Sequence, residues 1–298
     1  MKLATTTGDF FPFGLNVKES ISAVAEAGFK YIDYSFSYDY RTGTGLLGDD
    51  YKAFAKELLK MADNLGVKFV QAHSPLGRPF AENSEPFIAA TKRSIEAAAL
   101  LGIPNIVVHS GYLKGLTKEE TFKRNKEFYD NLLKLTDEFD INILTENYDK
   151  MENDSCYWVD SAEDVKELVQ YINHPRLKIC WDIGHGNLHD LPQHEAMAML
   201  RDHIVAFHMQ GNFGLSDDHV FPFMGTINME SVMNGLLDIG FNGYFTFEAD
   251  SMLYTWRRRK YDKDTRLQTY PVEFAKRLES LKYDMGKYVL EQYNCFEE

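Results

Sequence analysis

The sequence predicts an α/β protein folded as a single (β/α)8 barrel across residues 1–298, with its active site at the carboxyl ends of the strands. Eight short apolar runs alternate with longer segments of helical periodicity. The ends of the apolar runs recur about every 36 residues, the spacing expected of repeated βα units. No linker, low-complexity tract or shift in composition divides the chain, so we expect one domain.

The predicted strands are short runs with few charges, as is typical of parallel strands that are covered on both faces. They are Leu3–Thr7, Tyr31–Phe36, Lys68–His73, Asn105–His109, Asn142–Glu146, Lys178–Asp182, Ile204–His208 and Tyr244–Glu248.

The predicted helices are amphipathic segments between and after these strands. Gly28, Gly66, Gly102 and Gly240 each stand between a helix and the next strand, where a left-handed residue commonly ends a helix. A doubly wound open sheet is the alternative architecture, but eight units and the lack of a Gly-rich dinucleotide loop argue against it. The helices are Val17–Ala27, Tyr51–Leu65, Glu85–Leu101, Lys118–Asp137, Ala162–Ile172, Glu195–Asp202, Met229–Ile239 and Pro271–Tyr293.

The composition is that of a globular chain with an acidic surplus. There are 45 acidic and 32 basic side chains, a formal net charge of −13, and 44% of the residues are hydrophobic. The surplus argues against bulk binding to nucleic acid or anionic membranes, which demand clustered Lys and Arg. No apolar run approaches a membrane span, and Cys156, Cys180 and Cys295 form neither a disulfide framework nor a Cys-x-x-Cys pair. We therefore expect a cytoplasmic protein without a membrane partner.

Ionisable side chains stand at the ends of six of the eight predicted strands. In a parallel barrel all strand carboxyl ends lie at one face, which is where active sites are assembled. One such residue is explained by a strand that emerges into water, but six, three of them carboxylates, are not. The six are His73, His109, Glu146, Asp182, His208 and Glu248.

Four of these residues predict a divalent-metal site: Glu146, Asp182, His208 and Glu248. Three carboxylates and one imidazole suit Mn²⁺, Zn²⁺, Co²⁺ or Fe²⁺ better than Mg²⁺ alone. Without a cation the three carboxylates would repel one another, and at least one would become neutral.

Other polar residues follow strands at the same predicted face. His185 follows Asp182 by three residues, and we expect it to contact the substrate rather than to be a passive loop residue. For Glu152, Asp217 and His219 a substrate-binding role and a passive role are evenly balanced.

Basic residues at this face raise the question of a phosphate group on the substrate. Arg41, Arg78 and the run 257–260 (Arg-Arg-Arg-Lys) follow the second, third and eighth strands. A solvated surface is the favoured interpretation of the run, and phosphate binding is the alternative.

The motifs around these positions resemble the xylose-isomerase-like TIM-barrel superfamily, which groups sugar-phosphate isomerases and epimerases, inosose dehydratases and isomerases, and endonuclease IV. The resemblance spans essentially the whole barrel. Each motif is short, but their order is specific for the superfamily and weakly specific for its members. The motifs are Asn-Ile-Val-Val-His at 105–109, Ile-Leu-Thr-Glu-Asn at 143–147, Cys-Trp-Asp-Ile-Gly-His at 180–185, Ala-Phe-His-Met-Gln-Gly-Asn at 206–212, Asp-Asp-His-Val-Phe-Pro-Phe-Met-Gly-Thr-Ile at 217–227 and Phe-Thr-Phe-Glu-Ala at 245–249.

The ketose 3-epimerase pattern implies that Glu146, Asp182, His208 and Glu248 are the metal ligands. Glu152 and His185 match positions that bind substrate oxygens in those enzymes. The epimerases also place an arginine six residues after the metal histidine, whereas position 214 is Gly here, which puts the identity of the sugar in doubt.

The endonuclease IV pattern implies a larger metal set, which leaves a multinuclear site open. However, its Asp-Thr-Cys-His and Asn-Asp-Ser sequences read Asp-Ile-Gly-His and Gln-Gly-Asn here, and the acidic charge does not suit DNA. DNA repair is therefore the least favoured function. In order, the set maps onto His73, His109, Glu146, Asp182, His185, His208, Asp217, His219 and Glu248.

We therefore predict a metal-dependent sugar or sugar-phosphate isomerase or epimerase that abstracts a proton next to a carbonyl and forms an enediolate. Glu146 and Glu248 would act on opposite faces of the substrate, and His185 would polarise the carbonyl or move a proton. Loss of a β-hydroxyl or glycosyl group from the same intermediate would instead give a dehydratase or lyase acting on a keto-sugar or inosose.

A non-catalytic binding subunit is disfavoured, because clustered carboxylates are costly without a metal. The expected partner is a small carbohydrate, which His73, His109, Asp217 and His219 would help to bind. A homo-oligomer is compatible with the sequence, although no feature of it locates an interface.

Overall fold

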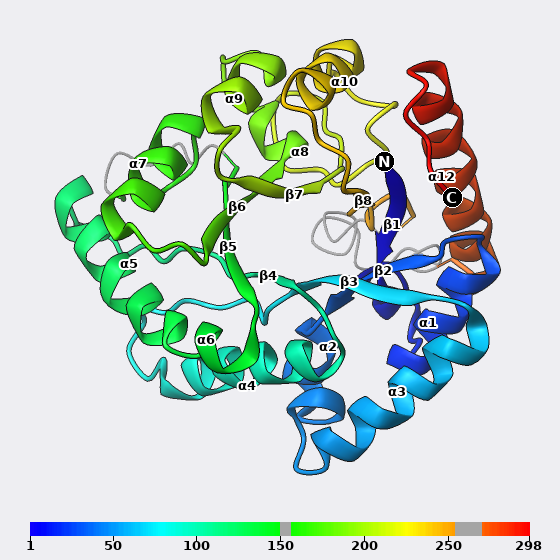
Figure 1. Ribbon diagram of the computed structural model, residues 1–298, viewed down its shortest axis with the longest axis horizontal. Coiled ribbons are helices and arrows are strands. Elements are labelled where there is room, and N and C mark those ends of the chain that lie inside the picture. Colours follow the sequence, from blue (N-terminus) through cyan, green and yellow to red (C-terminus); the bar gives the residue numbers. More distant parts are fainter. Residues whose placement is uncertain (150–155, 254–269) are drawn as a thin grey trace, which may run out of the picture.

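Eight parallel strands form a ring in the computed structural model, which describes residues 1–149, 156–253 and 270–298 (Figure 1). The strand order β7-β6-β5-β4-β3-β2-β1-β8 makes neighbours in the sequence neighbours in the sheet, and β1 pairs with β8. The predicted (β/α)8 barrel is confirmed. The strands are β1 (Lys2–Thr6), β2 (Tyr31–Ser35), β3 (Lys68–His73), β4 (Asn105–Val107), β5 (Asn142–Glu146), β6 (Leu177–Asp182), β7 (Ile204–His208) and β8 (Tyr244–Phe247).

The ring closes between β7 and β8 just past the last residue of β7. Met209 and Phe247 form a parallel bridge. The backbone N–H of Met209 donates to the carbonyl of Thr246 (2.8 Å), and that of Glu248 donates to the carbonyl of Met209 (3.2 Å). The closure therefore lies at the carboxyl-terminal rim, the face that carries the predicted ionisable residues.

Helices surround the ring, and α12 covers the wall beside β1 and α1 (Figure 1). The principal helices are α1 (Val17–Glu26), α3 (Tyr51–Leu65), α4 (Glu85–Leu100), α5 (Lys118–Leu133), α7 (Ala162–Ile172), α9 (Gln193–Leu200), α10 (Met229–Asp238) and α12 (Val272–Gln292). Shorter helical segments at turns and loops are η1 (Thr7–Phe13), α2 (Ser37–Thr42), η2 (Gly45–Leu47), α6 (Thr136–Phe139) and α8 (Ile183–Gly186).

Helix ends follow the local sequence. Asn16 caps α1 through a capping box with Glu19, because its side chain accepts from the N–H of Glu19 and the Glu19 side chain accepts from the N–H of Asn16. Gly66 ends α3 at φ +69°, a left-handed conformation that other residues adopt at a cost.

Several predicted boundaries differ from the structure by one or two residues, and three differences bear on the site or divide a helix. β4 ends at Val107 and β8 at Phe247, so His109 and Glu248 lie beyond their strands rather than at the last position. The predicted helix Lys118–Asp137 is two helices, since α5 ends at Leu133 and α6 begins at Thr136. Regular strand pairing ends at Val107 and Phe247, before the predicted strand ends, although single backbone hydrogen bonds from Val108 and Glu248 continue beyond them.

Two β-bulges change which residues face one another around the lumen. Between β2 and β3 the register runs from Ile32 opposite Phe69 to Asp33 opposite Gln71, which leaves one extra residue on β3. Between β6 and β7 it runs from Ile179 opposite Ile204 to Cys180 opposite Ala206. Bulges bend a strand and re-aim its side chains, and they are frequent next to active sites.

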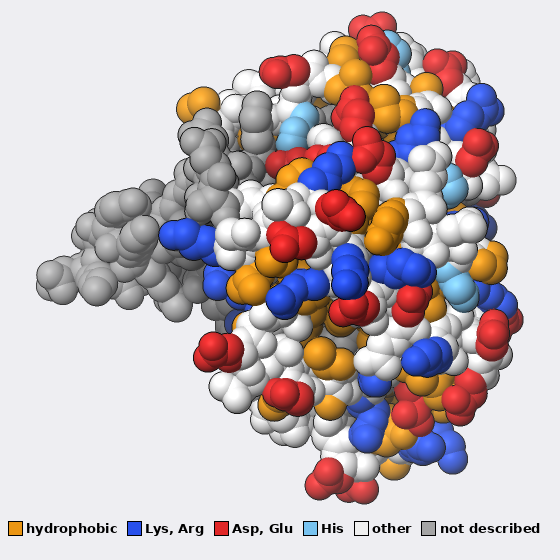
Figure 2. All heavy atoms as spheres, turned by 90° about the vertical axis from the view of Figure 1, so that its left-hand side faces the viewer, with side chains coloured by type: hydrophobic (Ala, Val, Ile, Leu, Met, Phe, Trp, Pro, Cys, Tyr) orange, Lys and Arg blue, Asp and Glu red, His pale blue; other side chains and the backbone are white. Residues whose placement is uncertain are grey.

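The surface does not carry its acidic surplus as one continuous patch on the face shown in Figure 2. Asp and Glu side chains alternate there with Lys and Arg over the helices at the left of Figure 1, α5 and α7 among them. Among the described residues, no helix combines the length and the apolarity that crossing a bilayer would require.

Candidate active site

Four predicted metal ligands meet at the carboxyl-terminal rim. Glu146, Asp182 and His208 are the last residues of β5, β6 and β7, and Glu248 is the first residue after β8. One ligand atom from each lies within 4.8 Å of one from every other. The barrel has thus brought together residues that are up to 102 positions apart in the sequence.

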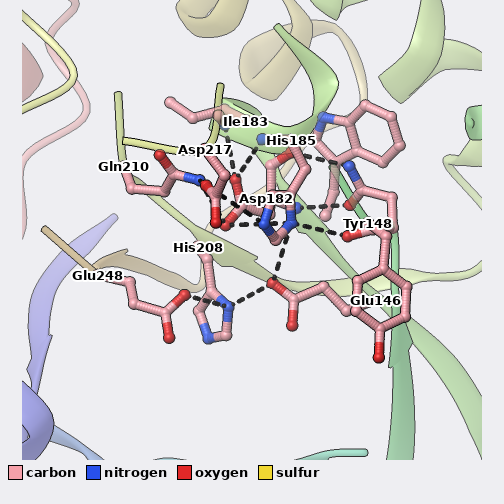
Figure 3. Close-up of polar contacts among 12 residues, drawn as sticks. Glu146, Tyr148, Asp182, Ile183, His185, His208, Gln210, Asp217 and Glu248 are labelled. Carbon is pink, nitrogen blue, oxygen red and sulfur yellow. Dashed lines mark hydrogen bonds and ion pairs between the residues drawn. The ribbon is translucent and has the colours of Figure 1, made fainter. Parts of the chain in front are cut away.

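The imidazole of His208 lies between two carboxylates (Figure 3). Its Nδ1 is 2.7 Å from Oε1 of Glu146 and 3.1 Å from Oε2 of Glu248. Burial by itself would raise the pKa of Glu146, but the charge of His208 and hydrogen bonds from three histidines hold it well below its usual range. Burial and the nearby charge of Glu146 raise the pKa of Glu248. The two glutamates therefore differ in proton affinity.

Asp182 is held by backbone groups on both sides. Its Oδ1 accepts from the N–H groups of Gly184 (2.6 Å) and His185 (2.8 Å) at the start of α8. The Asn147 side chain donates to the carbonyl of Asp182 (3.0 Å) and accepts from its N–H (2.8 Å). Because Oδ1 already accepts two hydrogen bonds, the other carboxylate oxygen, Oδ2, is left to contact Gln210 (3.4 Å) and to face the other three candidate ligands.

His185 links two parts of the site. Its Nδ1 donates to the carbonyl of Asn147 (2.8 Å), and its Nε2 lies 3.5 Å from Oδ1 of Asp217. Burial alone would lower the pKa of His185, but the charges of Asp182 and Asp217 raise it to about 10. The side chain is therefore a cation in the metal-free protein.

Two further groups of possible ligands flank the central four. His73 and His109 approach each other at 3.1 Å between their Nε2 atoms, and Nε2 of His109 is 2.9 Å from Oε2 of Glu146. On the other side His219 Nε2 is 3.0 Å from Oδ2 of Asp217. The two groups are His73, His109 and Glu146, and His185, Asp217 and His219.

Cys180 also approaches Glu146 and His208 closely enough to be counted with them. Burial raises the pKa of its thiol, which therefore stays protonated and is a poor metal ligand.

Two adjoining cavities open at this rim. One, of about 480 Å³, extends past Tyr40 and Arg41, and the other, of about 460 Å³, extends past Arg78 and Trp158. Both are lined by Asp217, His219 and Glu248. The second has an aromatic wall in which Trp158 contacts Tyr112 and Tyr148, at 3.8 and 4.1 Å between ring centroids.

The structure therefore gathers every predicted site residue that it describes. Glu152 and the basic run 257–260 lie outside the described residues. Sequence reasoning missed Asn147, Tyr148 and Gln210, as well as Asp33 and Gln71 in the lumen. Asn147 and Tyr148 directly follow the candidate ligand Glu146, and Gln210 follows His208 by two, so adjacency to a strand end was the available signal.

Comparison with known proteins assigns the family. Residues 21–268 match the family described as xylose isomerase-like TIM barrel. The chain belongs to this family.

Three proteins to which the chain is similar share 16–27% sequence identity with it. The chain is 27% identical to an uncharacterised protein of Methanocaldococcus jannaschii over 203 residues, covering 65% of this chain and 68% of the relative. It is 25% identical to the 2-oxo-tetronate isomerase of Haemophilus influenzae over 239 residues, covering 76% and 84%. The crystal structure of a D-psicose 3-epimerase in the presence of D-fructose superimposes with a TM-score of 0.74 at 16% identity, covering 97% and 99%.

Proposed function

We propose that the protein is a divalent-metal-dependent isomerase or epimerase of a small carbohydrate, acting on the carbon next to a carbonyl group. The observation that carries this proposal is the convergence of Glu146, Asp182, His208 and Glu248 at one point of the rim. The family and its isomerase and epimerase members support the same reaction class.

The donor set fits a divalent cation. Three carboxylates and an imidazole within 4.8 Å form a mixed oxygen and nitrogen site of the kind that Mn²⁺, Zn²⁺, Co²⁺ and Fe²⁺ occupy. The saturation of Asp182 Oδ1 by backbone N–H groups directs the other carboxylate oxygen to the site. A cation bound there would supply Lewis-acid stabilisation of the negative charge that develops on substrate oxygens.

Glu146 and Glu248 are the proposed acid–base pair. They lie on either side of His208 and have pKa values shifted in opposite directions, which is the pattern of carboxylates with different proton roles. Glu146 removes the proton from carbon, and Glu248 delivers a proton to the substrate. His185, whose Nε2 lies 3.5 Å from Asp217, donates a hydrogen bond to the substrate oxygen as charge builds on it.

The two cavities define the substrate's surroundings. Hydroxyl groups of Ser35 and Ser37, which line both cavities, are available for hydrogen bonds to a polyol. The aromatic wall around Trp158 offers a stacking surface for the apolar face of a sugar. Arg41 lines one cavity and Arg78 lines the other, and each would contact a negatively charged substituent on the substrate if there is one.

Solvent exchange at carbon tests the proposal. The Mn²⁺-loaded protein is incubated in D2O with D-fructose, D-psicose or 2-oxo-tetronate, and deuterium next to the carbonyl is followed by NMR. We expect exchange with the wild type and a loss of at least about 10²-fold in Glu146→Gln and Glu248→Gln. Asp39→Asn is the matched control, since Asp39 is buried but contacts Tyr34 rather than the four candidate ligands, and it should keep the wild-type rate. Wild-type exchange in both glutamine variants would overturn the proposal.

Loss of water or of a glycosyl group from the same intermediate remains the alternative outcome. Product mass decides between the two, since epimerisation and isomerisation conserve it and a lyase reaction does not.

The two flanking ligand groups favour one further candidate, a multinuclear phosphoesterase. Glu146 is shared by the central group and by His73 and His109, as expected of a carboxylate that bridges two metal ions. Elemental analysis after dialysis against Zn²⁺ or Mn²⁺ separates the candidates. One ion per chain supports the isomerase, whereas three ions, together with hydrolysis of bis(p-nitrophenyl) phosphate, would replace it by the phosphoesterase.

A further inference from the structure

A carboxylate in the barrel lumen lies behind the candidate ligand His208. Oδ2 of Asp33, on β2, is 3.2 Å from Nε2 of His208 and 3.1 Å from Nε2 of Gln71 on β3. All three side chains are buried, with 2% or less of their surface exposed. The imidazole thus has carboxylates at both nitrogens: Glu146 and Glu248 at Nδ1, and Asp33 at Nε2.

The β-bulge between β2 and β3 creates this arrangement. In parallel strands, residues that are opposite each other point to the same face of the sheet. The extra residue on β3 places Gln71, rather than Val70, opposite Asp33, and so both polar side chains face the lumen. Without the bulge Asp33 would face the lumen without the Gln71 amide that donates to it.

Burying the carboxylate of Asp33 in the barrel lumen costs free energy of folding, which suggests that it has a role at the candidate metal site. Barrel interiors are normally filled by branched apolar side chains. A buried carboxylate needs compensating hydrogen bonds, and among the described residues Oδ1 of Asp33 has no hydrogen-bond partner. Oδ2 of Asp33 has two, and one of them is His208.

We propose that Asp33 is a positioning residue that keeps the proton of His208 on Nε2 and thereby leaves the lone pair of Nδ1 for the metal. The inference rests on the metal site of the proposed function. Two carboxylates face Nδ1 and draw a proton to that nitrogen, where it would compete with a cation. The amide of Gln71, 2.8 Å from Nε2, can donate to this nitrogen and would favour the same unproductive tautomer. Asp33 opposes both effects because it accepts hydrogen bonds from Nε2 of His208 and from Gln71, as carboxylates behind metal-bound histidines do.

Zn²⁺ titration of the full chain by calorimetry tests the proposal without any substrate. Asp33→Asn and Asp33→Ala are expected to raise the Kd for Zn²⁺ by about 10- to 100-fold. Asp39→Asn is the matched control, since Asp39 is equally buried (1% exposed) but contacts Tyr34 rather than His208, and its Kd should stay within twofold of the wild type. Circular dichroism of the metal-free variants establishes that each is folded.

A second readout separates hydrogen bonding to His208 from a general structural role. In the Zn²⁺-loaded wild type, the Nε2 proton of His208 should give a downfield proton resonance that exchanges slowly with water and is missing in His208→Gln. We expect it to move upfield in Asp33→Asn, because an amide accepts a weaker hydrogen bond than a carboxylate. If Asp33→Asn does not fold, Gln71→Leu removes the donor that competes for Nε2 of His208, and a Kd no weaker than that of the wild type is then expected.

The possible failures are distinct. Zn²⁺ affinity that depends on Glu146 and Glu248 but not on Asp33, a weaker Kd in Gln71→Leu, or an unchanged Nε2 proton resonance in Asp33→Asn overturns the role of Asp33 alone. Zn²⁺ affinity that is insensitive to Glu146→Gln and Glu248→Gln overturns the metal site itself, and with it the proposed function.

Discussion

Asn147 and Asp182 are joined by two reciprocal hydrogen bonds between one side chain and one backbone. Nδ2 of Asn147 donates to the carbonyl of Asp182, and Oδ1 of Asn147 accepts from its N–H. The pair ties the end of β5 to the end of β6, where β-ladder pairing stops at Glu146 opposite Cys180. One amide thus extends the ladder by a further step and sets the position of a candidate metal ligand.

Asn147→Ala should therefore destabilise the fold and weaken the site together. Two buried backbone groups lose their partners, which costs about 2–4 kcal/mol in the free energy of unfolding. Urea unfolding measures this change, and Zn²⁺ calorimetry measures the accompanying loss of affinity. Asn142→Ala is the control, since the Asn142 side chain on β5 donates to the partly buried Asn105 side chain rather than to a backbone group, and it should cost less than about 1 kcal/mol. Equal effects of the two changes would contradict the assigned role of Asn147.

A methyl group at Gly184 should disturb the site through Gln210. A Cβ on Gly184 would overlap the Gln210 amide, which donates to Oδ1 of Asp217 (2.8 Å). Because Gln210 is fully buried and cannot easily move away, Gly184→Ala should cost about 1–3 kcal/mol in unfolding free energy and reduce solvent exchange at carbon.

The double variant Gly184→Ala/Gln210→Ala checks the cause of the Gly184 effect. Truncating Gln210 to Ala removes the side chain with which the new methyl group overlaps. The loss of unfolding free energy in the double variant should therefore be smaller than the sum of the losses in the two single variants. Strict additivity would show that the effect of Gly184→Ala has another origin.

Asp39 should give the protein a local pH dependence of stability. Burial raises the pKa of Asp39 to about 6 from 3.8, and hydrogen bonds from Tyr34 and Leu46 only partly offset the shift. The folded state then binds more protons than the unfolded state between these two pH values, so this contribution to stability falls as the pH rises through about 4 to 6. The difference amounts to about 3 kcal/mol.

Urea unfolding of the wild type and Asp39→Asn between pH 4 and pH 8 tests this dependence. The wild type should lose stability relative to the variant as the pH rises to about 6, and the difference should then level off. A difference that does not change with pH would show that Asp39 has the same proton affinity in both states.

Metal binding should release protons. Burial alone would lower the pKa of His208, but the acidic groups around it, Glu248 and Glu146 among them, raise it well above its usual value. The higher pKa favours a proton on His208 in the metal-free protein, and a proton on Nδ1 must leave before that atom binds a cation.

Zn²⁺ calorimetry at pH 7 in two buffers of different ionisation enthalpy measures this release, and we expect at least one proton per bound ion. Chelation should also lower the Tm, because the cation binds only the folded state. Equal enthalpies in the two buffers would contradict the expected protonation of His208.

The barrel and its four central candidate ligands were predictable because both follow from strand ends. Apolar runs followed by a carboxylate or an imidazole located Glu146, Asp182 and His208 at the last residues of β5, β6 and β7. Periodicity could not show where regular strand pairing stops, and so the prediction placed His109 and Glu248 inside their strands.

The lumen was not predictable by the same means. Asp33 and Gln71 lie within runs that read as ordinary buried strands, and only the bulge on β3 makes them face each other. A bulge shifts register by one residue and leaves no mark in hydrophobic periodicity. The two hydrogen bonds from Asn147 to the backbone of Asp182 were not predicted either, because an uncharged amide in the sequence cannot be distinguished from an ordinary loop residue.

The bridge between Met209 and Phe247 joins β7 to β8 at the carboxyl-terminal rim. Because it lies next to both His208 and Glu248, a local separation of the amino-terminal ends of β7 and β8 would leave these two side chains together. A cation bound by both residues would link the ends of β7 and β8 a second time, next to this bridge. Metal binding would then also stabilise the β7–β8 contact, and slower hydrogen exchange of the Met209 and Glu248 amide protons would report on both.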